Sequence, residues 1–267
     1  MNLRILEYVA GGVGGAFTFG VLVYAAVSYM VAARFNEQRP FSSAVRHIAW
    51  ETILAMLVQP LLPLYFVIGR RMGGRDDGVP VVFVHGYFQN RADFIWLARV
   101  LRREGFGPLY GVNYWSFGAI ERSAERVARF AEEVRVAHGR EQVDLVCHSL
   151  GGLVAAEVAR AHPKLVRRCV TIASPHAGIA WPGPVLGASG RQMRRAGAYM
   201  KARETAERAA VPLLSIYSSH DNVVYPAASS SLAHVGGRDV VVEGPGHFAI
   251  LFDERMAKEV VDFLRER

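Results

Sequence analysis

The chain has 267 residues, a length that suits one α/β domain with an additional segment, because such domains often run to about 250 residues. A core of that size is self-supporting without disulfides or metals. The formal net charge of +7 favours an anionic partner. No Lys/Arg-rich run is interleaved with aromatic residues, so nucleic acid is disfavoured and lipid headgroups remain. An arginine-rich solvated surface is the alternative explanation of the charge.

The first expected element is a long apolar helix near the N-terminus. No residue from Tyr8 to Ala33 is charged, and about 20 apolar residues suffice for a helix to span a bilayer. The glycines and the aromatic residues of this stretch also fit a membrane helix. A cleaved signal peptide is the alternative, but the apolar region is long for one and Arg4 is the single basic residue before it. We therefore predict an uncleaved transmembrane anchor.

A second apolar stretch runs from Thr52 to Gly69 after an arginine-bearing spacer. It contains Pro60 and Pro63, which membrane helices tolerate, so it predicts a second span, an interfacial segment or a segment docked on the following domain. Residues 1–72 are thus expected to form an N-terminal membrane-anchor region of one or two hydrophobic helices. We expect the protein at a bacterial-type inner membrane, with the orientation open because arginines flank both sides of the second stretch.

The glycine-rich polar segment at residues 73–78 predicts a linker, and residues 79–267 are expected to form the catalytic domain. From there strand-like and helix-like segments alternate, which indicates parallel βαβ units. An amphipathic helix is predicted between Ile120 and Val134. The predicted strands are Val81–Val84, Leu109–Tyr114, Val143–Cys147, Cys169–Ala173, Leu213–Tyr217 and Val240–Val242.

One of these strands runs through a polar corner directly into a predicted helix, with Ser149 at the corner. A serine in such a place is held in a strained backbone conformation, with its hydroxyl above the sheet edge. The turn is too tight for large neighbours. Gly151 and Gly152 are small on one side, and Cys147 is the small residue on the other. The alternative interpretation is that Ser149 only caps the helix.

This corner resembles the G-x-S-x-G elbow of the α/β-hydrolase superfamily, in its lipase/esterase branch, with Cys147 in place of the first glycine. In that fold the catalytic residues follow in the order Ser, acid, His. Asp221 stands in a segment similar to the family's acid loop, and His247 in one similar to its histidine loop. The resemblance extends from about Val81 to His247. It implies Ser149 as nucleophile, His247 as general base and Asp221 as the acid that orients the base.

The resemblance also implies an oxyanion hole. Val82–Phe88 is similar to the family's strand-H-G-x signature, and by that match Tyr87 donates its backbone N–H to the tetrahedral intermediate. The second donor is the N–H of Leu150, which follows the nucleophile at a helix N-terminus.

Further residues are expected to bind substrate. Aromatic side chains near the oxyanion loop predict an acyl-binding wall, although each of them would equally suit a plain core position. Thr171–Gly178 resembles a T-x-x-x-P-H-x-G stretch of lipases, whose histidine is expected to shape the pocket. The predicted substrate-binding residues are Phe88, Trp115, Phe117, His176 and Phe248.

A cap insertion is expected at residues 177–210. Its basic stretch from Arg191 to Arg203 predicts either a helix lying on an anionic bilayer or a solvated lid helix. No spacing of His, Cys, Asp or Glu suggests a metal site, and no phosphate-binding glycine loop follows a strand, so we expect chemistry without a cofactor.

Together these features predict an α/β-hydrolase fold, with a central mostly parallel sheet flanked by helices, a short cap and an N-terminal hydrophobic, transmembrane helix or helices. The expected function is that of a membrane-anchored serine hydrolase that cleaves lipid-type or small acyl esters through an acyl-enzyme on Ser149. One alternative is an acyltransferase or thioesterase with the same triad. The other is a catalytically silent, membrane-tethered binding module.

Overall fold

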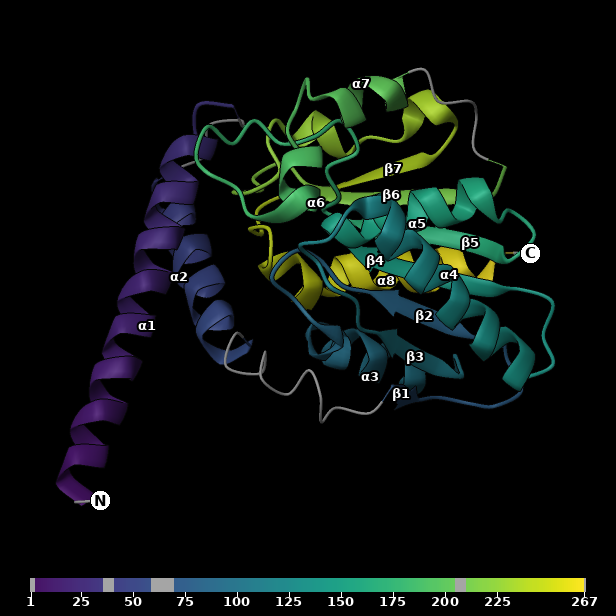
Figure 1. Ribbon diagram of the computed structural model, residues 1–267, viewed down its shortest axis with the longest axis horizontal. Helices are drawn as coiled ribbons and strands as arrows, with labels where there is room; N and C mark the ends of the chain where they lie inside the picture. The colour runs from purple at the N-terminus through teal and green to yellow at the C-terminus, as the bar shows by residue number, and fades with distance from the viewer. Residues whose placement is uncertain (1–2, 36–40, 59–69, 205–209, 267) are drawn as a thin grey trace.

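A seven-stranded sheet forms the centre of the structure, in the order β1-β3-β2-β4-β5-β6-β7 (Figure 1). Every neighbouring pair is parallel except β1 with β3. The structure is a computed structural model that describes residues 3–35, 41–58, 70–204 and 210–266, with the backbone alone described for residues 3–14, 17, 41, 42 and 204. The strands are β1 (Arg71–Gly73), β2 (Val81–Val84), β3 (Leu109–Val112), β4 (Val143–His148), β5 (Val166–Ile172), β6 (Leu213–Ser218) and β7 (Arg238–Val242).

All six predicted strands are confirmed, whereas β1 was not expected. The segment 73–78, predicted as a linker, begins at the end of β1, which pairs with Tyr110 and Leu109 of β3. The division of the chain at this segment stays a prediction.

Helices cover both faces of the sheet. On one face lie α4 (Ile120–Ala137) and α5 (Leu150–Ala161), and on the other α3 (Ile95–Arg103) and α8 (Glu254–Arg265). Side chains in β2 alternate between the two cores, so that Val82 and Val84 pack with α4 and α5. Val81 and Phe83 pack with α3 and α8. Burial on both faces explains why the strands read as continuous apolar runs.

The chain order of the strands reverses beside β2, which pairs with β3 on one side and with β4 on the other. In open parallel sheets, ligands bind outside the carboxyl ends of the strands at such a reversal. The loop that follows β2 and the corner that follows β4 therefore meet at the edge of the sheet where a site is expected.

The cap contains two short helices, α6 (Gly187–Gln192) and α7 (Ala198–Glu204). The predicted basic stretch is therefore not one continuous helix. Arg194 donates hydrogen bonds to backbone carbonyls within the cap, and Arg203 pairs with Glu157 of α5. Arg194 and Arg203 therefore bind groups of the protein itself. Residues 205–209 of the predicted cap lie outside the described residues. The remaining short helices are η2 (Arg91–Phe94), η3 (Ala227–Ser230), η4 (Ala233–Val235) and η5 (Ala249–Phe252).

The first two helices pack against each other as a hairpin beside the sheet and its covering helices (Figure 1). The predicted apolar helix is confirmed as α1 (Leu3–Ala32), and the start of the second apolar stretch lies in α2 (Phe41–Val58). The predicted transmembrane span is not borne out, because among the described residues no helix combines the length and apolar character that crossing a membrane requires. Residues 59–69, with Pro60 and Pro63, lie outside the described residues.

Buried polar residues show that the α1–α2 hairpin packs against the rest of the protein. One face of α1 is buried, and this face includes the polar residues Ser28 and Tyr29. On α2, Glu51 is 1% exposed. Ser28 accepts a hydrogen bond from Asn222, 194 residues further along the chain. Polar contacts of this kind belong to helices that dock on a domain, one of the alternatives expected for the second stretch.

Candidate active site

Ser149 occupies the corner between β4 and α5 in a strained backbone conformation, with φ 54° and ψ −125°. Such a conformation costs about 1–3 kcal/mol and is kept only where the surroundings impose it. Here the N–H of Ser149 donates to the carbonyl of Ile172 on β5 at 2.9 Å. The side chain makes no capping hydrogen bond to α5, so the helix-cap alternative is wrong.

Close approach of neighbouring backbone explains the glycines around this corner. A Cβ on Gly151 would lie 2.7 Å from the carbonyl oxygen of His85, and one on Gly152 would clash with the side chain of Ser174. A Cβ on Gly86, in the loop after β2, would lie 2.8 Å from the Cβ of Ser149. Cys147 is fully buried in the core and leaves the turn intact.

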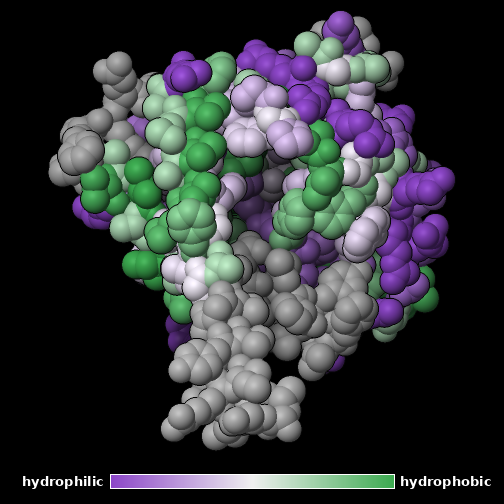
Figure 2. Space-filling view, turned by 60° about the vertical axis from the view of Figure 1, so that its left-hand side comes forward, coloured by the Kyte–Doolittle hydropathy of each residue, from purple (hydrophilic) through white to green (hydrophobic). Residues whose placement is uncertain are grey.

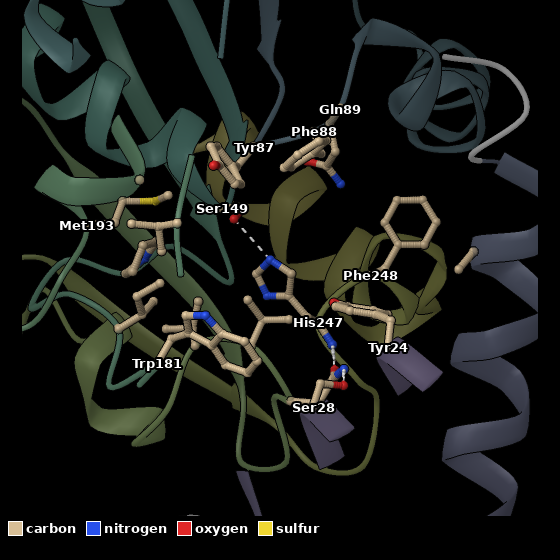
Figure 3. Close-up of a pocket in the computed structure, with 18 of the residues that line it drawn as sticks. Tyr24, Ser28, Tyr87, Phe88, Gln89, Ser149, Trp181, Met193, His247 and Phe248 are labelled. Atoms are coloured by element: carbon tan, nitrogen blue, oxygen red, sulfur yellow. Dashed lines mark hydrogen bonds between the residues drawn. The ribbon is translucent and has the colours of Figure 1, made fainter. Parts of the chain in front are cut away.

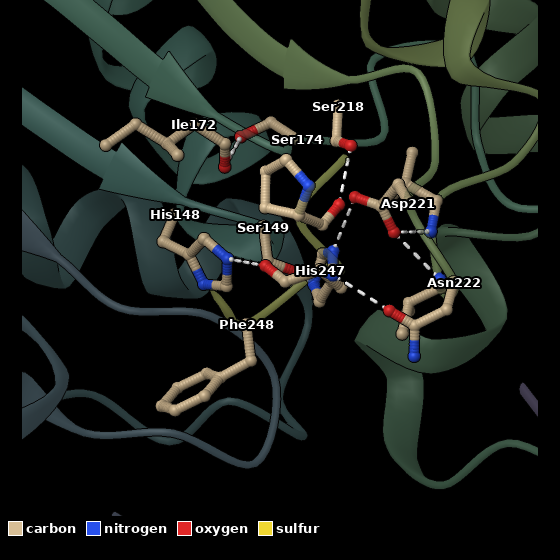
Figure 4. Close-up of polar contacts among 12 residues, drawn as sticks. His148, Ser149, Ile172, Ser174, Ser218, Asp221, Asn222, His247 and Phe248 are labelled. Carbon is tan, nitrogen blue, oxygen red and sulfur yellow. Dashed lines mark hydrogen bonds and ion pairs between the residues drawn. The ribbon is translucent and has the colours of Figure 1, made fainter. Parts of the chain in front are cut away.

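The three residues predicted as a triad lie in one hydrogen-bonded chain (Figure 4). The Oγ of Ser149 is 3.0 Å from Nε2 of His247, and Nδ1 of His247 is 2.9 Å from Oδ2 of Asp221. The other carboxylate oxygen of Asp221 accepts the N–H groups of Val223 and Val224, at 2.7 and 2.8 Å. With Oδ1 held in this way, Oδ2 keeps the proton of the imidazole on Nδ1 and leaves Nε2 to accept from the serine.

Electrostatics around His247 favour its protonated form. Burial alone lowers the pKa of His247, but the charge and hydrogen bond of Asp221 and the charge of Glu51 outweigh it, so that the pKa is raised above 6.5. His148 behaves in the opposite way, because burial and the proximity of His247 hold its pKa well below the ordinary value. Nε2 of His148 donates to the carbonyl of His247 at 3.0 Å, so this histidine supports the loop and does not reach Ser149 as a base.

Hydrogen bonds from residues that the sequence analysis did not identify hold the loop that contains His247. The N–H of His247 donates to Oδ1 of Asn222 at 2.8 Å, and Nδ2 of Asn222 donates to Ser28 of α1 at 2.8 Å. The N–H groups of Phe248 and Ala249 donate to the carboxylate of Glu51 at 2.9 and 2.7 Å. A charged residue beside an apolar stretch was the only available signal for Glu51, and nothing in the sequence pointed to Ser28.

A cavity of about 660 Å³ opens beside Ser149 and His247 (Figure 3). Its walls come from α1, α2, the loop after β2, the cap and the loops after β6 and β7. Most of the lining side chains are apolar, for example Val21, Leu186 and Phe248. A volume of this size lies within the range of about 300–1,000 Å³ that is typical of small-molecule sites.

Two of the predicted substrate-binding residues, Phe88 and Phe248, line this cavity, whereas the other three do not. Phe117 packs edge-on against Phe88 at 4.6 Å between ring centres, and Trp115 packs against Phe117 at 5.0 Å. Phe117 therefore lies one ring behind the wall, and Trp115 lies behind Phe117. His176 is buried, and its Nε2 is 3.0 Å from Oγ1 of Thr171. Burial lowers the pKa of His176 to about 3, so it stays neutral.

The predicted oxyanion donors lie on two sides of Ser149. Leu150 is the first residue of α5, and Tyr87 belongs to the loop after β2 and lines the cavity. The hydroxyl of Tyr87 donates to the carbonyl of Leu186 at 2.6 Å and accepts its N–H at 3.0 Å. Tyr87 thus connects the loop to the cap. The role of the two N–H groups stays a prediction. Within the described ranges, no three His, Cys, Asp or Glu side chains form a group that could hold a metal ion.

Comparison with known folds agrees with this geometry. The family profile described as the alpha/beta hydrolase fold matches residues 79–196. Lipase B of Aspergillus fumigatus superposes with a TM-score of 0.64 at 18% identity, over 72% of this chain and 54% of that one. The mature Bacillus licheniformis lipase gives 0.61 at 16% identity, over 72% and 94%. At these identities the structures show the shared fold alone. The chain thus has the α/β-hydrolase fold, with Ser149 at its elbow position.

Parts of the sequence are also similar to proteins of named activity. A triacylglycerol lipase of Burkholderia plantarii is 30% identical over 153 residues, which are 51% of this chain and 41% of the lipase. A triacylglycerol lipase of Pseudarthrobacter phenanthrenivorans is 30% identical over 37% of this chain and 34% of that protein. A probable alcohol acetyltransferase of Cyberlindnera fabianii is 28% identical over 35% and 26%. The chain thus spans between about a quarter and two fifths of these relatives. These partial matches to lipases support the resemblance to the lipase/esterase branch that the sequence implied.

We predict that the imidazole of His247 titrates above pH 6.5 because Asp221 stabilises its charged form. The neutral imidazole of His247 is then the major form only above the midpoint of this titration. Asp221→Asn removes the charge and should lower the midpoint, while His148 should stay neutral in both proteins. Imidazole NMR spectra recorded across a pH series would measure this. A midpoint that is unchanged by Asp221→Asn would contradict the assignment.

Proposed function

We propose that the protein is a serine hydrolase of the lipase/esterase type that cleaves carboxylic esters with apolar acyl chains. One observation carries this proposal: the hydrogen-bonded chain of Ser149, His247 and Asp221 opens on a mostly apolar cavity. Nucleophile, base and orienting acid stand in the order that acyl transfer requires.

Acylation begins when Oγ of Ser149 attacks the ester carbonyl and its proton passes to Nε2 of His247. Asp221 stabilises the imidazolium that results. Negative charge develops on the former carbonyl oxygen, where the backbone N–H groups of Tyr87 and Leu150 stabilise it. As the intermediate collapses, the leaving alcohol takes the proton from His247, and an acyl ester remains on Ser149.

Deacylation repeats these steps with water. His247 takes a proton from the water molecule that attacks the acyl-enzyme, and returns it to Ser149 as the carboxylic acid leaves. An alcohol or thiol in place of water would make the protein an acyltransferase, the activity named for one of its partial relatives. Release of free acid without an added acceptor distinguishes hydrolysis from this alternative and from a catalytically silent fold.

The substrate class follows from the cavity and its rim. Val21 and Tyr24 of α1 line the cavity together with Phe88 and with Leu186 of the cap, and Figure 3 shows the rings of Tyr24 and Phe88 in its wall. Walls of this kind favour an alkyl chain over a charged or strongly hydrated group. A lipid-type ester is therefore the proposed substrate.

The outer face of the α1–α2 hairpin supports docking on a lipid surface. Figure 2 shows hydrophobic side chains on both sides of a hollow in this face of the molecule. Exposed apolar residues recur at helical spacing on both helices. They are Phe19, Leu22, Val23, Val27 and Met30 on α1, and Val45, Trp50, Ile53 and Leu57 on α2.

This apolar face continues into the cavity, because Val21 and Tyr24 line its wall. Arg34, just after the end of α1, and Arg46, near the start of α2, are exposed, and the chain carries a net charge of +7. An amphipathic surface of this kind can lie in the interface of an anionic bilayer. In that position the cavity opens toward the membrane that holds its substrate.

Ser149→Ala should abolish ester hydrolysis while leaving the fold intact, because the side chain is small and serves only as the nucleophile. We expect the rate on p-nitrophenyl esters to fall by at least about 10⁴-fold. Wild-type activity should persist from short to long acyl chains. If the variant hydrolysed esters as fast as the wild type, Ser149 would not be the nucleophile. If the wild type hydrolysed only short-chain esters, the proposed lipid substrate would be wrong.

Phe19→Ser, Met30→Ser and Leu57→Ser together should weaken binding to phosphatidylglycerol vesicles by at least about tenfold, because each removes an exposed apolar side chain from the docking face. Flotation of the purified protein with vesicles measures this. Val136→Ser with Val241→Ser is the matched control, since both residues are exposed on the catalytic domain. Equal flotation of the triple variant and the wild type would overturn the docking proposal.

A further inference from the structure

The second N-terminal helix contributes a buried carboxylate to the histidine loop. We propose that Glu51 is a positioning residue for His247, which makes the α1–α2 hairpin a working part of the active site. This inference rests on the proposed function, because it assigns a role in the same proton transfer.

The contacts of Glu51 are specific. Both carboxylate oxygens are used, because Oε1 accepts the N–H of Phe248 at 2.9 Å and Oε2 accepts that of Ala249 at 2.7 Å. These are the two residues directly after His247. A Cβ on Gly246, the residue before it, would lie 2.6 Å from Oε2 of Glu51. The carboxylate therefore spans the backbone on both sides of the histidine.

Other parts of the chain hold the same loop, but none of them replaces Glu51. Asn222 accepts the N–H of His247, and His148 donates to its carbonyl. The hydroxyl of Ser218 donates to the carbonyl of Pro245 at 2.6 Å. The N–H groups of Phe248 and Ala249 lie in the protein interior, where an unpaired N–H costs about 1–3 kcal/mol. Glu51 satisfies both.

Glu51 is also a second negative charge near the imidazole. Its charge raises the pKa of His247, in the same direction as that of Asp221. Burial, with a smaller contribution from the charge of Asp221, raises the pKa of Glu51 to about 7, although the two backbone N–H groups and the charge of His247 lower it. Glu51 therefore carries its full negative charge above that pH, and its effect on His247 is greatest there. Among the described residues, further titratable groups near the pair are Asp221 from the loop after β6, His148 from β4 and, from α1, Tyr24 and Tyr29.

The consequence for the reaction concerns the imidazolium. His247 becomes positively charged when it takes the proton of Ser149, and a carboxylate that is already in place stabilises this charge at no cost of reorganisation. Geometry and charge act together here, because the hydrogen bonds that hold the loop also hold the carboxylate near the ring. The hairpin thus supports catalysis in addition to forming a wall of the cavity.

Glu51→Gln tests the charge. The side chain keeps its size, but its amide NH₂ then faces a backbone N–H in place of an oxygen. We expect kcat on a short p-nitrophenyl ester to fall by about tenfold to a hundredfold with little change in KM. Loss of the negative charge should also move the acidic limb of the pH profile, and the NMR titration midpoint of His247, to lower pH.

Glu51→Asp separates position from charge, because it keeps the carboxylate but withdraws it by one methylene. Its kcat should fall, while the midpoint of His247 should stay nearer to that of the wild type than in Glu51→Gln. Glu157→Gln is the matched control. Glu157 is a mostly buried glutamate of α5 that pairs with Arg160 and Arg203, so its loss should reduce stability without moving the midpoint.

The inference is overturned if Glu51→Gln leaves the midpoint of His247 unchanged or keeps the full kcat. If Glu51→Gln does not fold, Glu51→Asp decides: wild-type kcat in that variant overturns the positioning role. The NMR midpoint requires no turnover. A protein that hydrolyses no ester would therefore refute the proposed function while the coupling between Glu51 and His247 is still measured.

Discussion

The backbone around His247 is the constraint on which the rest of the site depends. This short loop is hydrogen-bonded to His148 at the end of β4, to Asn222 in the loop after β6 and to Glu51 of α2. Its imidazole must lie within reach of Ser149, which is held in a strained backbone conformation at the corner after β4. Because the charges of two carboxylates, those of Asp221 and Glu51, act on the buried ring, its protonated form is favoured where burial alone would oppose it.

Local sequence signals were sufficient for the catalytic core of the fold. Each predicted strand combines an apolar run with turn residues, and burial on both faces of the sheet preserves that pattern. The elbow could be predicted because close backbone approach demands glycine at Gly151 and Gly152. The order of Ser149, Asp221 and His247 along the chain then placed all three at the same edge of the sheet, where the structure brings them together.

The position of the hairpin could not be predicted, because an apolar helix that docks on a domain has nearly the composition of one that crosses a bilayer. Ser28 and Glu51 distinguish the two cases, but their partners, Asn222 and the loop at Phe248, lie about 200 residues away in the chain. Aromatic residues were equally ambiguous. Trp115 is separated from the cavity by the rings of Phe117 and Phe88, and composition does not distinguish this position from one in the wall.

The most direct test of the central claim is the reaction of the full-length protein with a long-chain alkyl phosphonate, followed by mass analysis of its peptides. The account predicts one phosphonyl group on the peptide that contains Ser149, and a labelling rate that falls as His247 becomes protonated. Ser149→Ala should take up none. Labelling of a different residue, or equal labelling of the variant, would contradict the account.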